Sequence, residues 1–368
     1  MSENVTISDR PRVLVIATWY PSGERPAVAP FVVRHVEAIG RGSDVTVLHV
    51  RLGASGGTLT ENYRGQRLVR LGLNPRRPFA ALRALRRIRR MAREFDLVHT
   101  MAFSAGLVAR VALIGRRPPW VHSEHWSGVS RPESVSRAWQ RLSGMRRILR
   151  APDWLTAVSS SLAASMQPWS RTGRLSIVPC VVESPDPVVA APHGDTARLV
   201  AVGGLVEGKQ PLVAVQIVRW LIDHGTPVTM TWVGDGPLRS AVDAAIREAG
   251  LVGEMTVTGA IEPQAVFDHL AAAAEALTCG RPVVLPEVGG FTDYADETNA
   301  VLLQDVSVEG FGRGIQAAIE RFRDVSAAQI VETVRGRFTA DQIGAAFEEI
   351  YRTLLVERGA VPPHERER

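Results

Sequence analysis

Residues 199–215 read LVAVGGLVEGKQPLVAV and decide the fold. The four apolar residues at the start predict a buried strand, two glycines follow, and the apolar spacing after Pro211 predicts a helix. Glycines at such a turn let backbone N–H groups approach an anion, and the helix N-terminus adds the positive end of its dipole. Lys209 lies in the turn and is a point charge suited to a diphosphate. The stretch therefore predicts a βα unit with a phosphate site, although a surface lysine in a turn is the plainer alternative.

The same alternation of strand and helix extends along the whole chain. Strands and helices in regular order predict parallel sheets that are covered by helices on both faces. The chain is therefore expected to be α/β, with two Rossmann-like, doubly wound domains. The predicted strands are residues 13–17, 44–50, 97–100, 120–122, a strand from 157, 199–202, 228–233, 255–258, 282–285 and 300–303, and the predicted helices are 31–39, 79–93, 105–113, 211–224, 238–249, 263–274 and 340–357.

The length and one linker-like stretch predict how the chain divides. With 368 residues it is about right for two domains of ~150–200 residues. Residues 183–196 are rich in proline and small residues, as linkers are. We expect domains at 1–183 and 184–339, with a C-terminal helix at 340–368 that closes back toward the first domain. The ligand site is expected in the cleft between the two domains, at the carboxyl ends of the strands.

Composition excludes several classes of protein. The hydrophobic fraction of 45% and the mean hydropathy of +0.02 are typical of a globular protein with two cores. No run approaches the ~20 apolar residues of a membrane helix, and the start of the chain does not read as a secretory signal. Two cysteines, Cys180 and Cys279, cannot form a disulfide framework. These features predict a cytoplasmic protein with reduced thiols.

Charge is distributed unevenly. Residues 1–183 hold 28 basic and 12 acidic residues, whereas residues 184–368 hold 15 and 26. A basic first half indicates an anionic partner, or two oppositely charged halves that face each other, and both interpretations stay open. Nucleic acid fits the charge but lacks any recognition motif, so no nucleic-acid partner is expected. Of the 43 cationic residues, Lys209 is the only lysine. This drift toward arginine suggests a GC-rich bacterium.

The helix predicted at residues 79–93 contains a cluster of arginines. Its arginines lie opposite an apolar stripe, so it could lie on an anionic membrane surface. A solvated arginine face on an ordinary surface helix is the simpler interpretation. The peripheral contact therefore stays one of two alternatives for the basic half. The arginines of this helix are Arg83, Arg86, Arg87, Arg89, Arg90 and Arg93.

Two further glycine turns follow strands of the second half. Gly234 begins GDGP, in which Pro237 suits the first position of a helix. Gly259 follows the strand after that, where exposed backbone groups could pair with a base. Each turn alone would be read as structural.

Taken together, these motifs resemble the donor domain of the retaining glycosyltransferases of family 4, which have the GT-B fold. The first half is similar to the same family in order and spacing, so the resemblance covers nearly the whole chain. The matching stretches are VGGLVEGKQPLVAV, WVGDGPLRSAVDAA, VTVTGAIEPQAVFDHLAAA, EALTCGRPVV, GGFTDYADETNAVLL and FTADQIGAAFEEIYRTLL in the second half, and VLVIATWYP, DLVHTMAFSAGLVA, VHSEHWSG, WLTAVSSSLAASM and IVPCVVE in the first.

The resemblance implies a donor site in the second half. Lys209 would contact the diphosphate, and Glu275 would accept hydrogen bonds from two ribose hydroxyls, although without the resemblance it is an ordinary helical glutamate. Backbone groups near Gly259 and Ile261 would hold the base. The remaining donor-binding residues implied are Gly203, Gly204 and Gly234.

In the first half the resemblance implies an acceptor side. His125 matches the family histidine near the sugar hydroxyls and the reacting centre, and with Lys209 it is a candidate catalytic residue. A lone histidine after a strand is more often structural, and His99 is expected to be a strand residue. The other residues expected on the acceptor side are Pro21, Ser22 and Glu124.

The sequence departs from the family at three places. Gly204 stands where an arginine is usual, and Met101 stands where a histidine is common. The largest departure is between Ala274 and Glu275, where on the order of twenty residues are absent. They would supply a strand, the first acid of a paired-glutamate motif and a Phe-Gly turn. Loss of a central strand leaves an unpaired sheet edge, so we expect a missing segment or a deletion that weakens donor binding.

The resemblance implies transfer of a hexosyl unit from a UDP- or GDP-linked sugar to the hydroxyl of a small-molecule or lipid-linked acceptor, with retention of configuration. Lys209 would stabilise charge on the leaving diphosphate, and a donor phosphate oxygen could take the acceptor proton. No cofactor beyond the donor is expected. No carboxylate pair suited to a metal is visible, so we predict metal independence. The alternatives are a homologue that binds the donor weakly without catalysis, and an epimerase whose acid–base carboxylates cannot be placed.

Overall fold

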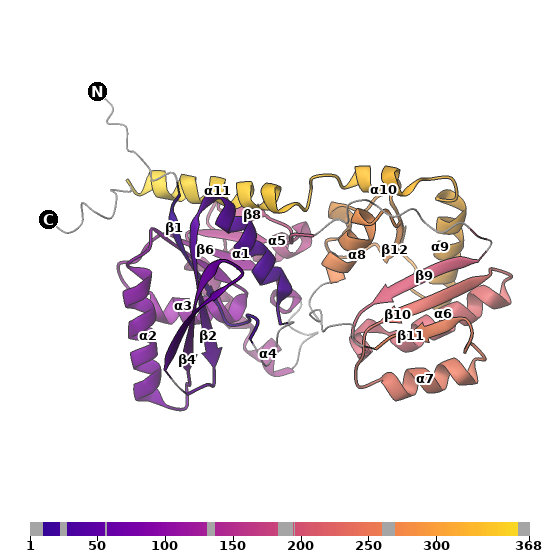
Figure 1. Cartoon of the computed structure of the whole chain (residues 1–368), viewed down its shortest axis with the longest axis horizontal. Coiled ribbons are helices and arrows are strands. Elements are labelled where there is room, and N and C mark those ends of the chain that lie inside the picture. The colour runs from indigo at the N-terminus through magenta and orange to yellow at the C-terminus, as the bar shows by residue number, and fades with distance from the viewer. Residues whose placement is uncertain are drawn as a thin grey trace, which may run out of the picture. The chain divides into compact units, whose positions relative to one another are not determined.

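The computed structural model describes residues 10–22, 28–55, 57–130, 137–182, 194, 196–259 and 269–359 (Figure 1). The chain divides into two compact units. The first unit contains Met1–Val181 and Phe338–Arg368, and the second contains Val182–Arg337. Within the described residues no helix is long and apolar enough to cross a membrane.

The first unit is built on one sheet of eight strands, in the order β3-β4-β2-β1-β5-β6-β7-β8. The central strand β1 pairs in parallel with β2 and β5, which places the carboxyl ends of these strands at one edge of the sheet. The strands are β1 (Arg12–Ala17), β2 (Asp44–Leu52), β3 (Thr58–Tyr63), β4 (Gln66–Leu73), β5 (Leu97–Met101), β6 (Trp120–Glu124), β7 (Trp154–Ala157) and β8 (Leu175–Ile177).

Helices cover both faces of this sheet, as the alternation predicted. Val13 and Val15 of β1 face a core that includes Val36 and Phe347, whereas Leu14 and Ile16 face a second core that includes Ile88. This division follows from the period of two in a strand. The helices are α1 (Pro30–Gly42), α2 (Pro78–Ala92), α3 (Phe103–Ala112), α4 (Arg137–Arg141), α5 (Ser160–Met166) and α11 (Ala340–Glu357), with 3-10 turns η1 (Ser127–Val129), η3 (Ser143–Arg150) and η4 (Gln167–Trp169).

The last helix belongs to the first unit. Helix α11 packs against α1, and a Cβ at Gly344 would lie 2.5 Å from the Ala38 carbonyl oxygen. Only glycine allows this approach. Phe347 and Tyr351 from the same helix are buried in the core beside the sheet.

Strands β3 and β4 were missed from the sequence, and β3 is antiparallel to β4, so the sheet is mixed at its edge. The sequence feature that marks the turn between them is the pair Arg64–Gly65, and in the structure both residues have a positive φ, 49° and 80°. Two such residues form the tight turn of a hairpin. Polar residues lie on both faces of β3, so the strand lacks the alternation of apolar and polar residues that predicts a strand.

The second unit has two small parallel sheets. The first has the order β11-β10-β9 and the second is the pair β12-β13. The strands are β9 (Ala197–Val202), β10 (Val228–Val233), β11 (Met255–Val257), β12 (Val283–Pro286) and β13 (Ala300–Leu303), and the helices are α6 (Pro211–Asp223), α7 (Arg239–Glu248), α8 (His269–Thr278), α9 (Val308–Arg321) and α10 (Ala327–Thr333), with 3-10 turns η5 (Glu207–Lys209) and η6 (Phe291–Asp293).

Helix α9 was also missed, because three glycines lower its helix propensity. Packing explains two of them. A Cβ at Gly312 would lie 2.1 Å from the Trp220 ring, and a Cβ at Gly314 would lie 2.4 Å from Leu303. Close contact with α6 and β13 therefore outweighs propensity. Ser307 caps the helix by accepting a hydrogen bond from the Gly310 N–H.

Candidate functional site

Three glycine turns meet at the carboxyl ends of β9, β10 and β11. We call Gly203, Gly204, Gly234, Gly236 and Gly259 the glycine corner. The Gly203 N–H donates to the Val233 carbonyl at 3.0 Å, and the Gly234 N–H donates to the Gly259 carbonyl at 3.1 Å. The predicted donor-binding residues Gly203, Gly204, Gly234 and Gly259 therefore lie together at one edge of the sheet, where doubly wound folds bind ligands.

Gly234 cannot carry a side chain. Its φ is 144°, and a Cβ there would lie 2.1 Å from the Gly203 carbonyl oxygen. Gly236 is similarly restricted, since its Cβ would lie 2.7 Å from the Leu205 oxygen. At Gly204, by contrast, a Cβ would meet only the Asp235 oxygen at 3.6 Å, which is ordinary contact. The corner thus depends on Gly234 and Gly236 for its geometry and leaves room at Gly204.

Lys209 folds back over the corner. Its Cγ, Cδ and Cε lie 3.5–3.6 Å from the position that a Cβ at Gly203 would occupy. The lysine stem therefore lies alongside Gly203 at a distance that a Cβ there would meet as ordinary contact, and Lys209 is half-buried. Lys209 belongs to η5 rather than to a helix N-terminus, because Gln210 adopts a left-handed φ of 52° and α6 begins only at Pro211.

Gly204 supplies a free donor to the same edge. Within the described ranges its backbone N–H has no hydrogen-bond acceptor, while the neighbouring Leu205 N–H donates to the Asp235 carbonyl at 3.0 Å. A half-exposed, unpaired N–H gains most from a ligand that accepts a hydrogen bond. Together with the Lys209 ammonium on its packed stem, it gives the corner the chemistry of a phosphate site.

The roles of the other predicted donor residues stay predictions. Glu275 is half-buried on α8, whose main contacts among the described elements are with α10 and β12. Ile261 falls outside the described residues. Helix α8 runs unbroken across the Ala274–Glu275 junction.

The sheet of this unit is interrupted beside β9. Strand β9 is the edge of its sheet, and β12 pairs only with β13 among the described residues. One face of β9 is open, since Val200 is 67% exposed and Val202 is 51% exposed. In a doubly wound sheet the first strand is central, with a neighbour on each side. The second neighbour of β9 is therefore lacking within the described part of this unit.

In the first unit His125 directly follows β6. Its ring packs against Phe31 and His35, with centroids 4.7 and 5.1 Å away. Both ring nitrogens are inaccessible to solvent and have no hydrogen-bond partner among the residues that the structure describes. Burial, with the repulsion of nearby histidines, holds the pKa of His125 well below its ordinary value, so the ring is neutral. An unsatisfied buried donor and acceptor is unusual and points to a functional position.

Glu124 holds the loop that carries His125. Its carboxylate is fully buried, and one oxygen accepts hydrogen bonds from the backbone N–H groups of His125 and Trp126 at 2.9 and 3.0 Å. The other oxygen lies 3.4 Å from His122 Nε2. The side chain expected on the acceptor side is therefore turned inward, and it orders the loop.

Sequence reasoning missed a cluster of buried histidines around His125, which we call the histidine cluster: His35, His99, His122 and His125. His99 lies in β5 as predicted, with Nδ1 2.6 Å from the Tyr351 hydroxyl and Nε2 2.6 Å from Ser123 Oγ. Burial lowers the pKa values of His35 and His99. The available signal was the repetition of histidine near the ends of neighbouring parallel strands.

The remaining acceptor-side residues follow β1, whose neighbour in the sheet is β5. Pro21 is buried and Ser22 is half-buried, at the same carboxyl edge that leads to His125. Met101 ends β5 and is 1% exposed.

One group in this region could hold a metal ion. Ligand atoms of His35, His125 and Cys180 lie within 4.8 Å of one another. Each ring nitrogen of His35, however, already faces a backbone carbonyl, that of Phe31 at 2.9 Å and that of Pro179 at 3.2 Å. His35 can ligate a metal only if it gives up one of these contacts, so the geometry supports a metal weakly.

The chain is similar in sequence to known glycosyltransferases. Residues 27–181 match the model of the glycosyl transferase 4-like domain. A 2-deoxystreptamine glucosyltransferase from Streptomyces kanamyceticus is 30% identical over 201 residues, which cover 46% of this chain and 51% of that protein. A 2-deoxystreptamine N-acetyl-D-glucosaminyltransferase from Streptomyces fradiae is 28% identical over 327 residues, 76% of each chain. The alignment thus spans about half the length of the first relative.

Solved structures establish the fold. Sucrose-phosphate synthase from Thermosynechococcus elongatus superposes with a TM-score of 0.68 at 18% identity, covering 95% of this chain and 100% of that one. Anabaena HepE, solved in complex with UDP and glucose, gives 0.69 at 17% identity, covering 94% and 100%. The fold is GT-B, that of a large class of glycosyltransferases. Within this fold, residues 27–181 of the first unit are similar to the glycosyl transferase 4-like domain.

Proposed function

We propose that this protein is a glycosyltransferase that moves a hexosyl unit from a nucleoside diphosphate sugar to an acceptor hydroxyl with retention of configuration. The observation that supports the proposal is the glycine corner, where the free Gly204 N–H and the Lys209 stem packed over Gly203 would hold a phosphate. The names of the two Streptomyces relatives support transfer of a sugar, and the complex of Anabaena HepE with UDP and glucose supports a nucleotide sugar as donor.

The corner would act on the leaving group. Negative charge grows on the diphosphate as the glycosidic bond breaks, and Lys209 with the Gly204 N–H would stabilise it. A donor phosphate oxygen on the same face would take the acceptor proton, so the chemistry needs no dedicated protein base and, we propose, no metal ion. The neutral ring of His125 could offer one donor and one acceptor to sugar hydroxyls without adding charge, provided that the acceptor-side loop moves to expose the ring nitrogens, which are buried in this structure. The resemblance gives Glu275 the ribose hydroxyls and Ile261 the base.

The chemistry of the acceptor is inferred from other observations than those that support the donor. Both relatives are named for 2-deoxystreptamine, which makes this aminocyclitol the first acceptor to test. An amine is cationic, and residues 1–183 hold 28 basic against 12 acidic residues. Electrostatics therefore favours a neutral or anionic acceptor over a cationic one. We propose that a hydroxyl-bearing acceptor without net positive charge, small or lipid-linked, is used better than 2-deoxystreptamine.

A second candidate function rests on the interrupted sheet. Because β9 lacks a second neighbour and Glu275 follows Ala274 on one unbroken helix, the protein could bind the donor weakly and act as a non-catalytic partner. The gene sequence across the Ala274 and Glu275 codons bears on this directly. An extra coding stretch of roughly twenty residues would favour the enzyme, and contiguous codons would favour the impaired homologue.

The test is a transfer assay with UDP- and GDP-linked hexoses and a panel of hydroxyl acceptors. We expect release of one nucleoside diphosphate per product and a product whose anomeric configuration, read by NMR, matches that of the donor. Inversion would refute the retaining mechanism. Binding of nucleotide without any release would support the non-catalytic alternative, and absence of both would overturn the proposal.

A further inference from the structure

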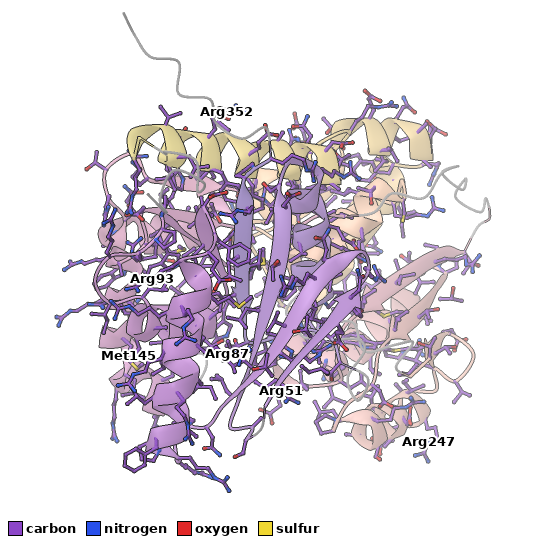
Figure 2. The ribbon with its side chains drawn as sticks, turned by 60° about the vertical axis from the view of Figure 1, so that its left-hand side comes forward. Arg51, Arg87, Arg93, Met145, Arg247 and Arg352 are labelled. Carbon is purple, nitrogen blue, oxygen red and sulfur yellow. The ribbon has the colours of Figure 1, made fainter. Side chains whose placement is uncertain are left out.

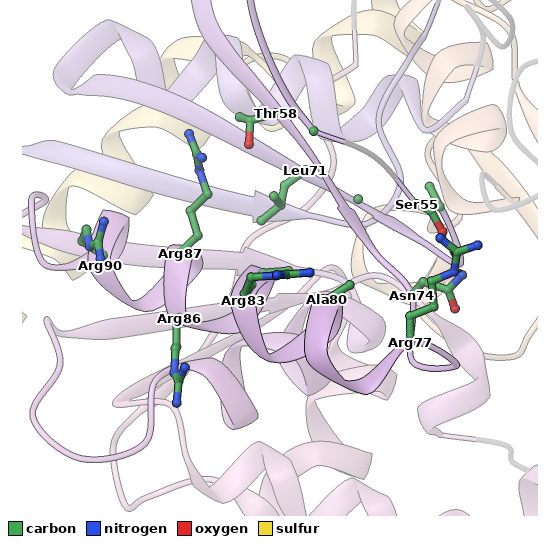
Figure 3. A pocket seen from close by; sticks show the side chains of 14 residues that line it. Ser55, Thr58, Leu71, Asn74, Arg77, Ala80, Arg83, Arg86, Arg87 and Arg90 are labelled. Carbon is green, nitrogen blue, oxygen red and sulfur yellow. Dashed lines mark hydrogen bonds between the residues drawn. The ribbon is translucent and has the colours of Figure 1, made fainter.

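A groove of about 560 Å³ lies between α2 and the β3–β4 hairpin, in the first unit (Figure 3). It is distinct from the histidine cluster. No aspartate or glutamate is among the described residues that line it. Five of the lining residues are arginines: Arg77, Arg83, Arg86, Arg87 and Arg90.

None of these five guanidinium groups forms an ion pair with a described carboxylate, and all five side chains are exposed. Other arginines of the same unit are neutralised. Arg70 lies 2.6 Å from a Glu61 oxygen, and Arg12 lies 3.4 Å from an Asp96 oxygen. The groove therefore concentrates positive charge that the protein leaves uncompensated.

The arginines are spread along the helix rather than gathered at one point. Arg87 points toward the strands, near Thr58 and Leu71, whereas Arg86 points away from them (Figure 3). The spacing from Arg77 to Arg90 corresponds to roughly 20 Å at 1.5 Å per residue. Figure 2 labels Arg87 on α2 and Arg93, the residue that directly follows this helix. A single phosphate could reach only part of this array, so several phosphates in one surface suit it better.

Apolar side chains are exposed on the same helix. Phe79 is 82% exposed and Leu82 is 44% exposed, both in the first turns of α2. Exposed aromatic and aliphatic residues beside arginines are the pattern of a helix that rests in the headgroup layer of a membrane. A soluble phosphate ligand would give no reason for Phe79 to remain in water.

We propose that the arginine groove and Phe79 bind the phosphate groups of an anionic lipid surface. Attraction of arginines to anionic headgroups is additive over short distances and is screened by salt. All residues of this surface belong to the first unit. Binding to lipid can therefore be tested independently of the transferase activity.

The experiment measures co-sedimentation of the whole protein with vesicles. Vesicles of phosphatidylcholine are compared with vesicles that also contain phosphatidylglycerol. The test variant is Arg83→Gln/Arg87→Gln/Arg90→Gln, because glutamine keeps the helix propensity of α2. The matched control removes the same charge elsewhere, at the exposed Arg110, Arg147 and Arg323.

We expect wild type to bind only the anionic vesicles, and added salt to release it. Each arginine is worth about fivefold near such a surface, so the groove variant should bind roughly 100-fold more weakly, while the control stays close to wild type. Phe79→Ser should also weaken binding. Equal binding to both vesicles, or equal loss in the control variant, would overturn the proposal. Tight binding of an RNA oligonucleotide that displaces the vesicles, or of inorganic pyrophosphate at the same arginines, would replace the lipid with that ligand.

Discussion

Replacing Lys209 with methionine separates the charge of this residue from its packing. The lysine Cγ, Cδ and Cε lie against Gly203 at 3.5–3.6 Å from the missing Cβ position. Methionine places atoms of similar size at the same three positions, so it keeps the stem and removes only the ammonium. Lys209→Ala removes both, and it serves as the comparison for packing.

The expected loss follows from the role of a charged contact in the transition state. Loss of a partner to a developing diphosphate charge should cost about 2–4 kcal/mol. At 1.36 kcal/mol per tenfold change, that is roughly 30- to 1,000-fold in kcat/KM. Since the methionine stem is retained, Lys209→Met should lower the free energy of unfolding less than Lys209→Ala does.

The assay measures kcat/KM for donor turnover and unfolding by urea for wild type, Lys209→Met and Lys209→Ala. We expect both variants to lose turnover and only Lys209→Ala to lose stability. Unchanged kcat/KM in Lys209→Met would refute the role of the charge. A large loss of stability in that variant would show that the ammonium acts in folding rather than on the donor.

Three further predictions concern the two candidate sites. Below about pH 6.5 the rings of His35, His99 and His125 gain protons in the unfolded chain but not in the folded chain, where their pKa values are lowered. The free energy of unfolding should therefore decrease as the pH drops, by up to about 1.4 kcal/mol per pH unit for each ring. A free energy of unfolding by urea that stays constant from pH 7 to 5 would contradict the buried neutral state. An arginine can replace Gly204 without a clash, because its Cβ would meet only the Asp235 oxygen at 3.6 Å. The added positive charge of Gly204→Arg should tighten binding of UDP or GDP about tenfold or more. Weaker binding in calorimetry would count against the proposed position of the diphosphate. Glu124→Gln should keep turnover, because one amide oxygen can still accept from both loop N–H groups, whereas Glu124→Ala should lose it; equal loss of kcat in both variants would instead assign a role to the negative charge.

Much of the fold was predictable because local patterns and tertiary packing agree. The period of two in β1 divides its residues between two cores, and the helix at α11 was predicted with the bounds that the structure gives, Ala340–Glu357. Where the local sequence pattern and the tertiary packing disagree, the prediction from sequence failed. Helix α9 contains glycines that its own propensity disfavours and that contacts with Trp220 and Leu303 require. Such contacts connect residues far apart in sequence, so no local window reveals them.

The candidate site was predictable in part for the same reason. Glycine turns after successive strands of a parallel sheet must share an edge, and Gly203, Gly234 and Gly259 do so. That Lys209 folds over Gly203, and that Glu124 turns inward, depends on side-chain packing that spacing does not encode. The roles of these residues stay proposals.

The most direct test of the central claim is a calorimetric titration with UDP and with GDP. We expect saturable one-to-one binding of one of these nucleotides to wild type. Gly204→Ala should bind the same nucleotide with similar affinity, because its N–H remains and the added Cβ lies 3.6 Å from its nearest neighbour. Gly234→Ala should lose binding, since its Cβ would lie 2.1 Å from the Gly203 carbonyl oxygen and must displace the corner. Undiminished binding in a folded Gly234→Ala protein, or no binding of either nucleotide to wild type, would contradict a diphosphate site at the glycine corner.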